Sequence, residues 1–207
     1  QLANMVRVAT VVALTLGSVA CRQKPAPEQP PIKIGAIFAV TGGASNLGAP
    51  EAKTAETFVE KLNQAGGING QKIQLIVKDS ATTPANAISL AKQLIEEEKV
   101  LAIIGPSTSG ETMAIKEICQ EGQTILMSCA AAETIVNPMA SFVFKTPQKD
   151  SDAARRIFQV LKDKGITKVG VITSNDGFGV AGGKQLAALA PHLRPRRHEQ
   201  RHVLCRP

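Results

Sequence analysis

The sequence predicts an α/β fold in which a doubly wound parallel sheet carries helices on both faces. Short apolar segments typical of strands alternate with segments whose apolar residues recur every three or four positions, as in helices. Glycine and proline separate these segments, as expected for turns. Hydrophobic residues make up 43% of the 207 residues, which is enough for a buried core. Alternation of this kind favours parallel strands joined by crossover helices.

The predicted elements follow one another from Ile32 onward. Strands are expected at 32–40, 72–79, 100–104, 124–127, 142–144 and 168–173. Helices are expected between them, with Pro50 and Pro84 in the first turns of the first two, because proline suits the start of a helix. A later helix is expected to be capped by Asp150 or Ser151, and the last runs to about Ala190.

Both ends of the chain differ in composition from the middle. Residues 1–20 carry one charge, an apolar run and then small residues, the pattern of a secretory signal peptide. Residues 21–31 are rich in proline and are expected to form a tether. Ser18 to Cys21 resembles a bacterial lipobox, in which the cysteine is lipidated, although leucine is usual where Ser18 stands. Simple cleavage after Ala20 and lipidation of Cys21 both remain open, and both predict an exported protein.

The charge of the chain is concentrated in its last 17 residues. The whole chain carries +7, while residues 191–207 hold five arginines and one glutamate, a net of +4. These residues lack periodicity, contain all three histidines and are expected to form a disordered basic tail. Because no basic stripe interleaved with aromatics occurs elsewhere, no nucleic-acid partner is predicted.

The stretch from Val100 to Ala132 contains the candidate binding residues. Two predicted strands in it end in loops of small residues, Ser107-Thr108-Ser109 and Ala130-Ala131-Ala132. Since ligands of open α/β sheets bind beyond the carboxyl ends of the strands, both loops are expected to line one crevice. Hydroxyls and free amides at a helix start suit a carboxylate. A Ser107 or Ser109 that merely caps the helix explains the same residues equally well.

Cysteine spacing predicts no metal site, because no pair of the four cysteines has the spacing of a zinc ligand motif. Cys119 and Cys129 are expected to be buried thiols. No cofactor is predicted either.

The glycine-rich loop Thr41 to Gly48 permits a second interpretation. Following a strand and preceding a helix, it resembles the nucleotide-binding turn of short-chain dehydrogenases. Those enzymes need a catalytic tyrosine, and the chain contains none. A nicotinamide-dependent enzyme is therefore disfavoured.

A larger set of motifs, in order along residues 32–190, resembles another family. The set comprises the loop ending in Leu47-Gly48, the helix end Asn63 to Gln71, Ile104 to Ser109, Ser128 to Ala132, Phe144 to Pro147 and Asp176 to Gly179. Together these motifs resemble the periplasmic substrate-binding proteins of ABC transporters for branched-chain and other hydrophobic amino acids. The resemblance implies the type I periplasmic-binding-protein fold, a two-lobed clamshell, with a first lobe at 32–146 and part of a second at 147–190. Members of that family are nearly twice as long, so the chain is expected to be truncated.

The resemblance also implies a function and a site. The protein is expected to bind an amino acid in the periplasm and deliver it to a permease in the inner membrane, without catalysis. Residues 107–109 would meet the ligand carboxylate and residues 130–132 its ammonium, although Ala132 stands where a threonine is usual. Leu47 and Phe178 would face an apolar ligand side chain. A sensory lobe of the same fold, with no role in transport, is the remaining alternative.

Overall fold

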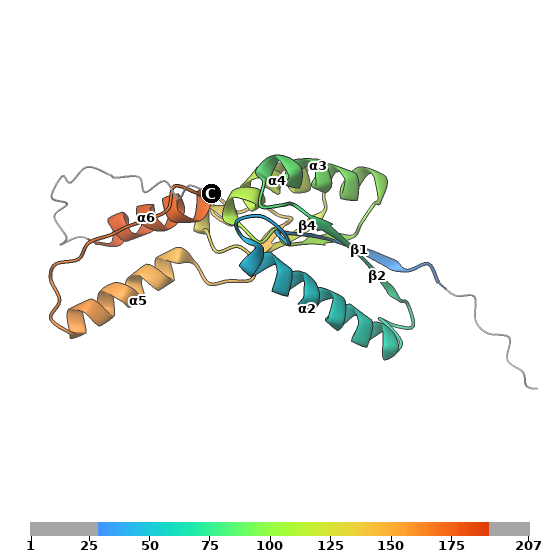
Figure 1. Ribbon diagram of the computed structural model, residues 1–207, viewed down its shortest axis with the longest axis horizontal. Coiled ribbons are helices and arrows are strands. Elements are labelled where there is room, and N and C mark those ends of the chain that lie inside the picture. Colours follow the sequence, from blue (N-terminus) through green and yellow to red (C-terminus); the bar gives the residue numbers. More distant parts are fainter. Residues whose placement is uncertain (1–28, 191–207) are drawn as a thin grey trace, which may run out of the picture. The chain divides into compact units, whose positions relative to one another are not determined.

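The computed structural model of the chain, which describes residues 29–190, contains one five-stranded sheet (Figure 1). All four strand pairings are parallel, in the order β2-β1-β3-β4-β5. The strands are β1 (Ile32–Phe38), β2 (Ile73–Asp79), β3 (Ala102–Ile104), β4 (Ile125–Ser128) and β5 (Val143–Lys145). The predicted α/β class with a doubly wound parallel sheet is therefore confirmed.

Helices cover both faces of this sheet. The helices of the described residues are α2 (Ser45–Gln64), α3 (Pro84–Lys92), α4 (Ser109–Glu121), α5 (Asp150–Asp163) and α6 (Gly177–Leu189), with a π-helical turn η1 (Gln93–Glu97) and a 3-10 turn η2 (Glu133–Ile135). Helix α2 lies on one face, and α3 and α4 lie together on the other (Figure 1). Helices α5 and α6 pack against each other, and α6 also contacts α4.

Strand residues alternate between two apolar cores because successive side chains point to opposite faces of a sheet. Ile37 points to the α3–α4 side, where it joins Leu94 and Ile115 in the larger core. Its neighbour Phe38 points to the α2 side and packs in the smaller core with Ala52. The alternation read from the sequence thus places each helix on its face of the sheet.

Helix α2 begins earlier than predicted and rests directly on the end of β1. It starts at Ser45, so that Pro50 lies inside the helix and not in its first turn. Gly48 is buried against the main chain of Ala39, and a Cβ added to it would lie 2.3 Å from the Ala39 carbonyl oxygen. The absence of a side chain at Gly48 therefore allows this close contact.

The start of α4 is capped by Thr108 and by neither Ser107 nor Ser109. The Thr108 hydroxyl accepts the amide of Glu111 at 3.4 Å, and it donates to the Glu111 carboxylate at 2.5 Å. The spacing of a threonine followed three residues later by a glutamate is that of a capping box. At the start of α5, the residue in the capping position is Lys149, so the predicted cap by Asp150 or Ser151 is wrong.

The predicted strand at 168–173 is also wrong. These residues form no strand, and Val171 and Ile172 are 52% and 87% exposed. A strand forms only where a neighbouring strand takes up its backbone hydrogen bonds. Within residues 29–190, the five paired strands belong to one sheet, and none of them pairs with this segment.

Several predictions concern residues 1–28 and 191–207, which lie outside the described residues. They are the signal peptide, most of the tether, the possible lipidation of Cys21, and the basic tail. Within residues 29–190, none of the helices combines the length and hydrophobicity that a bilayer-spanning segment requires.

Candidate functional site

The strand order places the predicted binding loops at one edge of the sheet. The chain moves from β1 to β2 on one side and later to β3 on the other, so the order reverses between β1 and β3. In open parallel sheets, ligands bind outside the carboxyl ends of the strands at such a reversal. Loops 39–44, 105–108 and 129–132 leave β1, β3 and β4 at this edge. The candidate site is therefore built from these three loops.

Ser107 joins the two loops on either side of the reversal. Its hydroxyl oxygen accepts the amide of Ala39 at 3.1 Å and donates to the Glu51 carboxylate at 2.5 Å. The side chain is only 4% exposed. Because a hydroxyl has a single hydrogen, an ionised Glu51 leaves Ser107 with none to donate to a ligand.

Ser109 joins the β3 loop to the β4 loop. Its hydroxyl oxygen accepts the amide of Ala132 at 3.2 Å, and the residue is 3% exposed. The amide of Cys129 donates to the carbonyl of Pro106 at 3.2 Å and holds the same two loops together. The structure thus brings the Ser107–Ser109 and Ala130–Ala132 loops into contact, as the fold class predicts.

The first turn of α4 retains donors for an anion. Amides in the first turn of a helix have no acceptor within the helix. Thr108 takes the amide of Glu111, and no hydrogen bond within the described residues takes those of Ser109 and Gly110. Gly177, at the start of α6, lies against this turn so closely that a Cβ on it would be 2.8 Å from the amide nitrogen of Gly110.

The alanine loop after β4 is fixed by side chains. The amide of Ala130 donates to the Ser128 hydroxyl at 3.1 Å, and that hydroxyl also bonds Thr112 at 2.7 Å. The carbonyl of Ala131 accepts from the Lys145 ammonium at 2.5 Å. Of the three alanines, Ala130 and Ala132 are buried and Ala131 is half-buried.

Two carboxyl groups lie behind the serine loop. Burial raises the pKa of Glu51, opposed by the hydrogen bond from Ser107 and reinforced by the charge of Glu111. Glu111 itself is fully buried, and its Oε1 atom has no hydrogen-bond partner among residues 29–190. Burial, and then the charge of Glu51, raise the pKa of the Cys129 thiol to about 11, against a smaller opposing effect of a hydrogen bond with the Gly105 backbone. This side of the site therefore contains two acidic side chains, Glu51 and Glu111.

Leu47 and Phe178 lie in the first turns of α2 and α6, respectively. They are 49% and 53% exposed, so both present apolar surface that the described residues leave uncovered. Phe178 follows Gly177, whose backbone packs against the start of α4. Their contact with a ligand remains a prediction.

The sequence indicated some of the remaining residues at this edge and not others. The capping box formed by Thr108 and Glu111 is readable from its spacing. No local sequence pattern identifies Glu51 or Lys145 as a site residue. Glu51 contacts Ser107, which is distant in sequence, and Lys145 binds a backbone carbonyl, which any residue carries.

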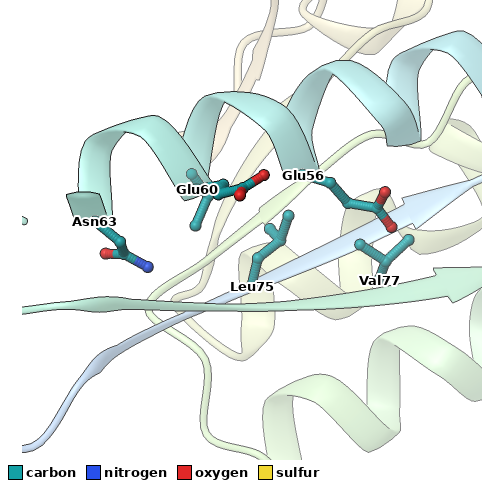
Figure 2. A pocket seen from close by; sticks show the side chains of 6 residues that line it. Glu56, Glu60, Asn63, Leu75 and Val77 are labelled. Carbon is teal, nitrogen blue, oxygen red and sulfur yellow. The ribbon is translucent and has the colours of Figure 1, made fainter.

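A surface hollow lies elsewhere, between α2 and the edge strand β2 (Figure 2). Its lining combines two glutamates with apolar side chains and an asparagine: Glu56, Val59, Glu60, Asn63, Leu75 and Val77. Asn63 is already bonded to both backbone groups of Ile73. Over residues 29–190, no cluster of three histidine, cysteine or acidic side chains could hold a metal ion.

Comparison with known proteins decides the family. A profile of the family described as periplasmic binding protein matches residues 31–195, which is most of the chain. The protein belongs to this periplasmic binding protein family. Its parallel sheet is accordingly the type I periplasmic-binding-protein fold, as the resemblance implied.

Individual relatives of this periplasmic binding protein are binding proteins. An amino acid binding protein of Pseudomonas aeruginosa is 31% identical over 153 residues, which are 72% of this chain and 40% of the relative. An extracellular ligand-binding receptor from Rhodopseudomonas palustris has a TM-score of 0.72 and 33% identity over 80% of this chain and 45% of its own. The branched-chain amino acid transporter substrate-binding protein LivJ from Streptococcus pneumoniae, in complex with isoleucine, has a TM-score of 0.70 and 29% identity over 76% of this chain and 46% of its own. The chain thus spans less than half the length of these relatives.

Proposed function

We propose that the protein is the extracytoplasmic solute-binding component of an ABC importer and binds a hydrophobic or small neutral amino acid. One observation supports this proposal. The first turn of α4 contacts the alanine loop (Ala130–Ala132) at the edge of the sheet where the strand order reverses. Free amides of Ser109 and Gly110 suit the ligand carboxylate, since a helix N-terminus favours anions. The carbonyls of the Ala130–Ala132 loop suit the ligand ammonium.

An amino acid ligand carries two charges, so it needs both the amide donors of α4 and the carbonyl acceptors of the alanine loop. Removing one partner of a buried charge pair costs about 3–5 kcal/mol, so a zwitterion in a closed cleft needs a donor set and an acceptor set. Leu47 and Phe178 offer apolar surface to the rest of the ligand. Neither side chain can satisfy a polar group, which favours isoleucine, leucine, valine or alanine over glutamate, lysine or a sugar.

Binding without catalysis agrees with the hydrogen bonds of the two serines. Ser107 bonds Glu51 and Ala39, and Ser109 bonds Ala132. A serine nucleophile needs a neighbouring base, most often histidine, to take its proton. All three histidines of the sequence lie within residues 191–207. We therefore propose that the protein is not an enzyme, and that its partners are an amino acid and the membrane permease that receives it.

Calorimetric titration tests the ligand. The proteins are the 207-residue chain and a hybrid in which residues 31–190 replace the matching part of the LivJ relative. The panel is isoleucine, leucine, valine, alanine, glutamate, lysine and glucose, and we expect the neutral apolar amino acids to bind most tightly. Thr108→Val with Ser109→Ala should weaken binding about tenfold or more, because it removes the hydroxyls that hold the first turn of α4 and the amide of Ala132 in position. Ser89→Ala, on an exposed face of α3, is the control.

Preference for glutamate or glucose would contradict the assigned ligand class. Unchanged affinity in the double variant would contradict the assigned site.

Export and anchoring are tested separately. We propose a periplasmic location, with the N-terminus cleaved after Ala20 or lipidated at Cys21. Mass analysis of the N-terminus from the periplasmic and membrane fractions of a bacterial host distinguishes these two products. An uncleaved protein found only in the cytosol would contradict export.

A further inference from the structure

The ammonium of Lys145 donates a hydrogen bond to a main-chain carbonyl in the alanine loop. In the proposed function, the ammonium of the ligand would bind a carbonyl of the same loop. Its Nζ atom lies 2.5 Å from the carbonyl oxygen of Ala131 and 2.8 Å from that of Gln148. Both interactions have the geometry of an ammonium bound to main-chain acceptors, which is also how the α-ammonium of an amino acid would bind the loop.

The other polar groups of the loop are held by residues that a ligand has no reason to move. The amides of Ala130 and Ala132 donate to the buried hydroxyls of Ser128 and Ser109. The amide of Glu133 donates to Asp150 at 3.1 Å. Ala131 is different because its partner is a cation at the end of a long, partly exposed side chain.

The Lys145 ammonium also has alternative partners nearby, the carboxylates of Asp150 and Glu133. Burial lowers the pKa of Lys145, while the nearby carboxylates of Asp150 and Glu133 oppose that shift by favouring the ammonium. Each of these carboxylates accepts one backbone amide, and a carboxylate can accept several hydrogen bonds. They can therefore receive the Lys145 ammonium if it leaves Ala131.

We propose, resting on the amino-acid-binding function above, that Lys145 is a specificity-determining placeholder that the ligand ammonium displaces from the carbonyl of Ala131. The displaced side chain turns toward Asp150 and Glu133 and releases the carbonyl of Gln148. Gln148 lies in the segment between β5 and α5. Ligand binding at the alanine loop is thereby coupled to the connection that leads out of the sheet.

The test measures the affinity of the 207-residue chain and its Lys145→Met variant for two probes by calorimetry. The probes are leucine and 4-methylpentanoic acid, which has the same carbon chain and carboxylate but no ammonium. Removing the competing ammonium should tighten leucine binding about tenfold, comparable to one charge-assisted hydrogen bond. The analogue should gain little, so the preference for leucine should increase in the variant. Lys162→Met changes the net charge equally at an exposed position of α5 and should leave both affinities unchanged.

A second measurement follows Lys145 directly in the unsubstituted chain. With lysines labelled by reductive ¹³C-methylation and the Lys145 signal assigned from the variant, leucine should shift that signal and raise the pKa of Lys145. Leucine binding to the unsubstituted chain that is equal or tighter than to Lys145→Met would overturn the displacement while leaving the amino-acid function in place. So would binding of the analogue as tightly as leucine with a loss of affinity in Lys145→Met, because Lys145 would then pair with the carboxylate. If neither protein binds leucine, the displacement is wrong, and the titration of the amino-acid panel then decides whether the proposed function is wrong as well.

Discussion

The hydroxyl of Ser107 donates to the carboxylate of Glu51 at 2.5 Å, and this bond links the loop after β3 to helix α2. The same hydroxyl accepts the amide of Ala39 at the end of β1. One buried serine thus fixes three elements at the reversal of the sheet. When Glu51 is ionised, the Ser107 hydroxyl must direct its hydrogen toward this carboxylate. Substitution of Glu51 therefore tests what this charge contributes to stability.

Glu51→Gln is expected to stabilise the protein at neutral pH. Burial raises the pKa of Glu51, so the folded state holds this proton more tightly than the unfolded state does. Above the folded-state pKa the ionised carboxyl costs stability, and that cost disappears as the pH falls through the folded-state pKa toward the ordinary value of 4.5. The glutamine keeps an acceptor for Ser107 without the charge. We expect a gain of at most about 1 kcal/mol at pH 7, because solvent screens a half-buried group.

Urea unfolding at pH 7 and near pH 4 measures this difference, which should shrink at the lower pH. Glu56→Gln, at an exposed position of the same helix, removes the same charge and is the control. A Glu51→Gln variant that is less stable at pH 7, or whose advantage is independent of pH, would show that Glu51 is stabilising in its ionised form.

Gly48→Ala is expected to destabilise the protein by about 2–3 kcal/mol or more, as overpacking against an element that cannot move typically does. The new Cβ would lie within 2.3–2.5 Å of three main-chain atoms of Ala39. Helix propensity acts in the opposite direction, by about 1 kcal/mol at most, and the clash outweighs it. Gly43→Ala is the matched control, since a Cβ there meets nothing within 4 Å. Thermal unfolding of both variants decides the point, and equal melting temperatures would mean that α2 does not rest on β1 as described.

The two described cysteines are expected to resist alkylation in the native protein. Burial raises the pKa of Cys119 to about 12, and burial together with the charge of Glu51 raises that of Cys129 to about 11. Since the thiolate is the reactive form, Cys129 should react roughly a hundredfold more slowly at pH 8 than in the urea-unfolded chain. Cys119, which is fully buried, should be slower still.

Iodoacetamide labelling followed by peptide mass spectrometry measures both rates. Glu51→Gln should accelerate the labelling of Cys129 and leave Cys119 unchanged, because only Cys129 is affected by that carboxylate. Native labelling of Cys129 at the unfolded rate would contradict its burial.

Sequence reasoning succeeded where a residue's role follows from its neighbours along the chain. Buried strands and helix faces have characteristic periods, and the α/β rule then brings the loops after β3 and β4 together. It could not foresee that Ser107 meets Glu51, 56 residues away, because no local pattern encodes that contact. The prediction of a strand at residues 168–173 is wrong for a related reason. The apolar pattern there is typical of a strand, but the pattern does not show whether a neighbouring strand is available to pair with it.

Glu133 at the start of η2 and the first turn of α5 hold each other through a reciprocal pair of hydrogen bonds. The Glu133 carboxylate accepts the amide of Ser151 at 3.3 Å, and the Asp150 carboxylate accepts the amide of Glu133 at 3.1 Å. A hydrogen bond from the Ser151 side chain, opposed by burial and assisted by the Ser151 amide and by the charges of Lys149 and Lys145, lowers the pKa of Glu133. Its contribution to stability is therefore present above the ordinary value of 4.5 and is lost as the pH falls through the lower, folded-state pKa.

Glu133→Ala is expected to accelerate hydrogen exchange of the Ser151 amide about tenfold, which corresponds to the loss of one hydrogen bond to a charged acceptor. Asp150→Ala should have the same effect on the Glu133 amide, because each carboxylate protects the amide of the other segment. Asp152→Ala is the matched control, since Asp152 lies in the same turn of α5 but pairs with Arg155 on the surface. Amide-resolved exchange measured by NMR at pH 7 distinguishes the variants. Asp152→Ala could instead accelerate exchange of the Ser151 amide as much as Glu133→Ala does. In that case negative charge in general stabilises the first turn of α5, and the reciprocal hydrogen bonds do not connect the alanine loop to this helix.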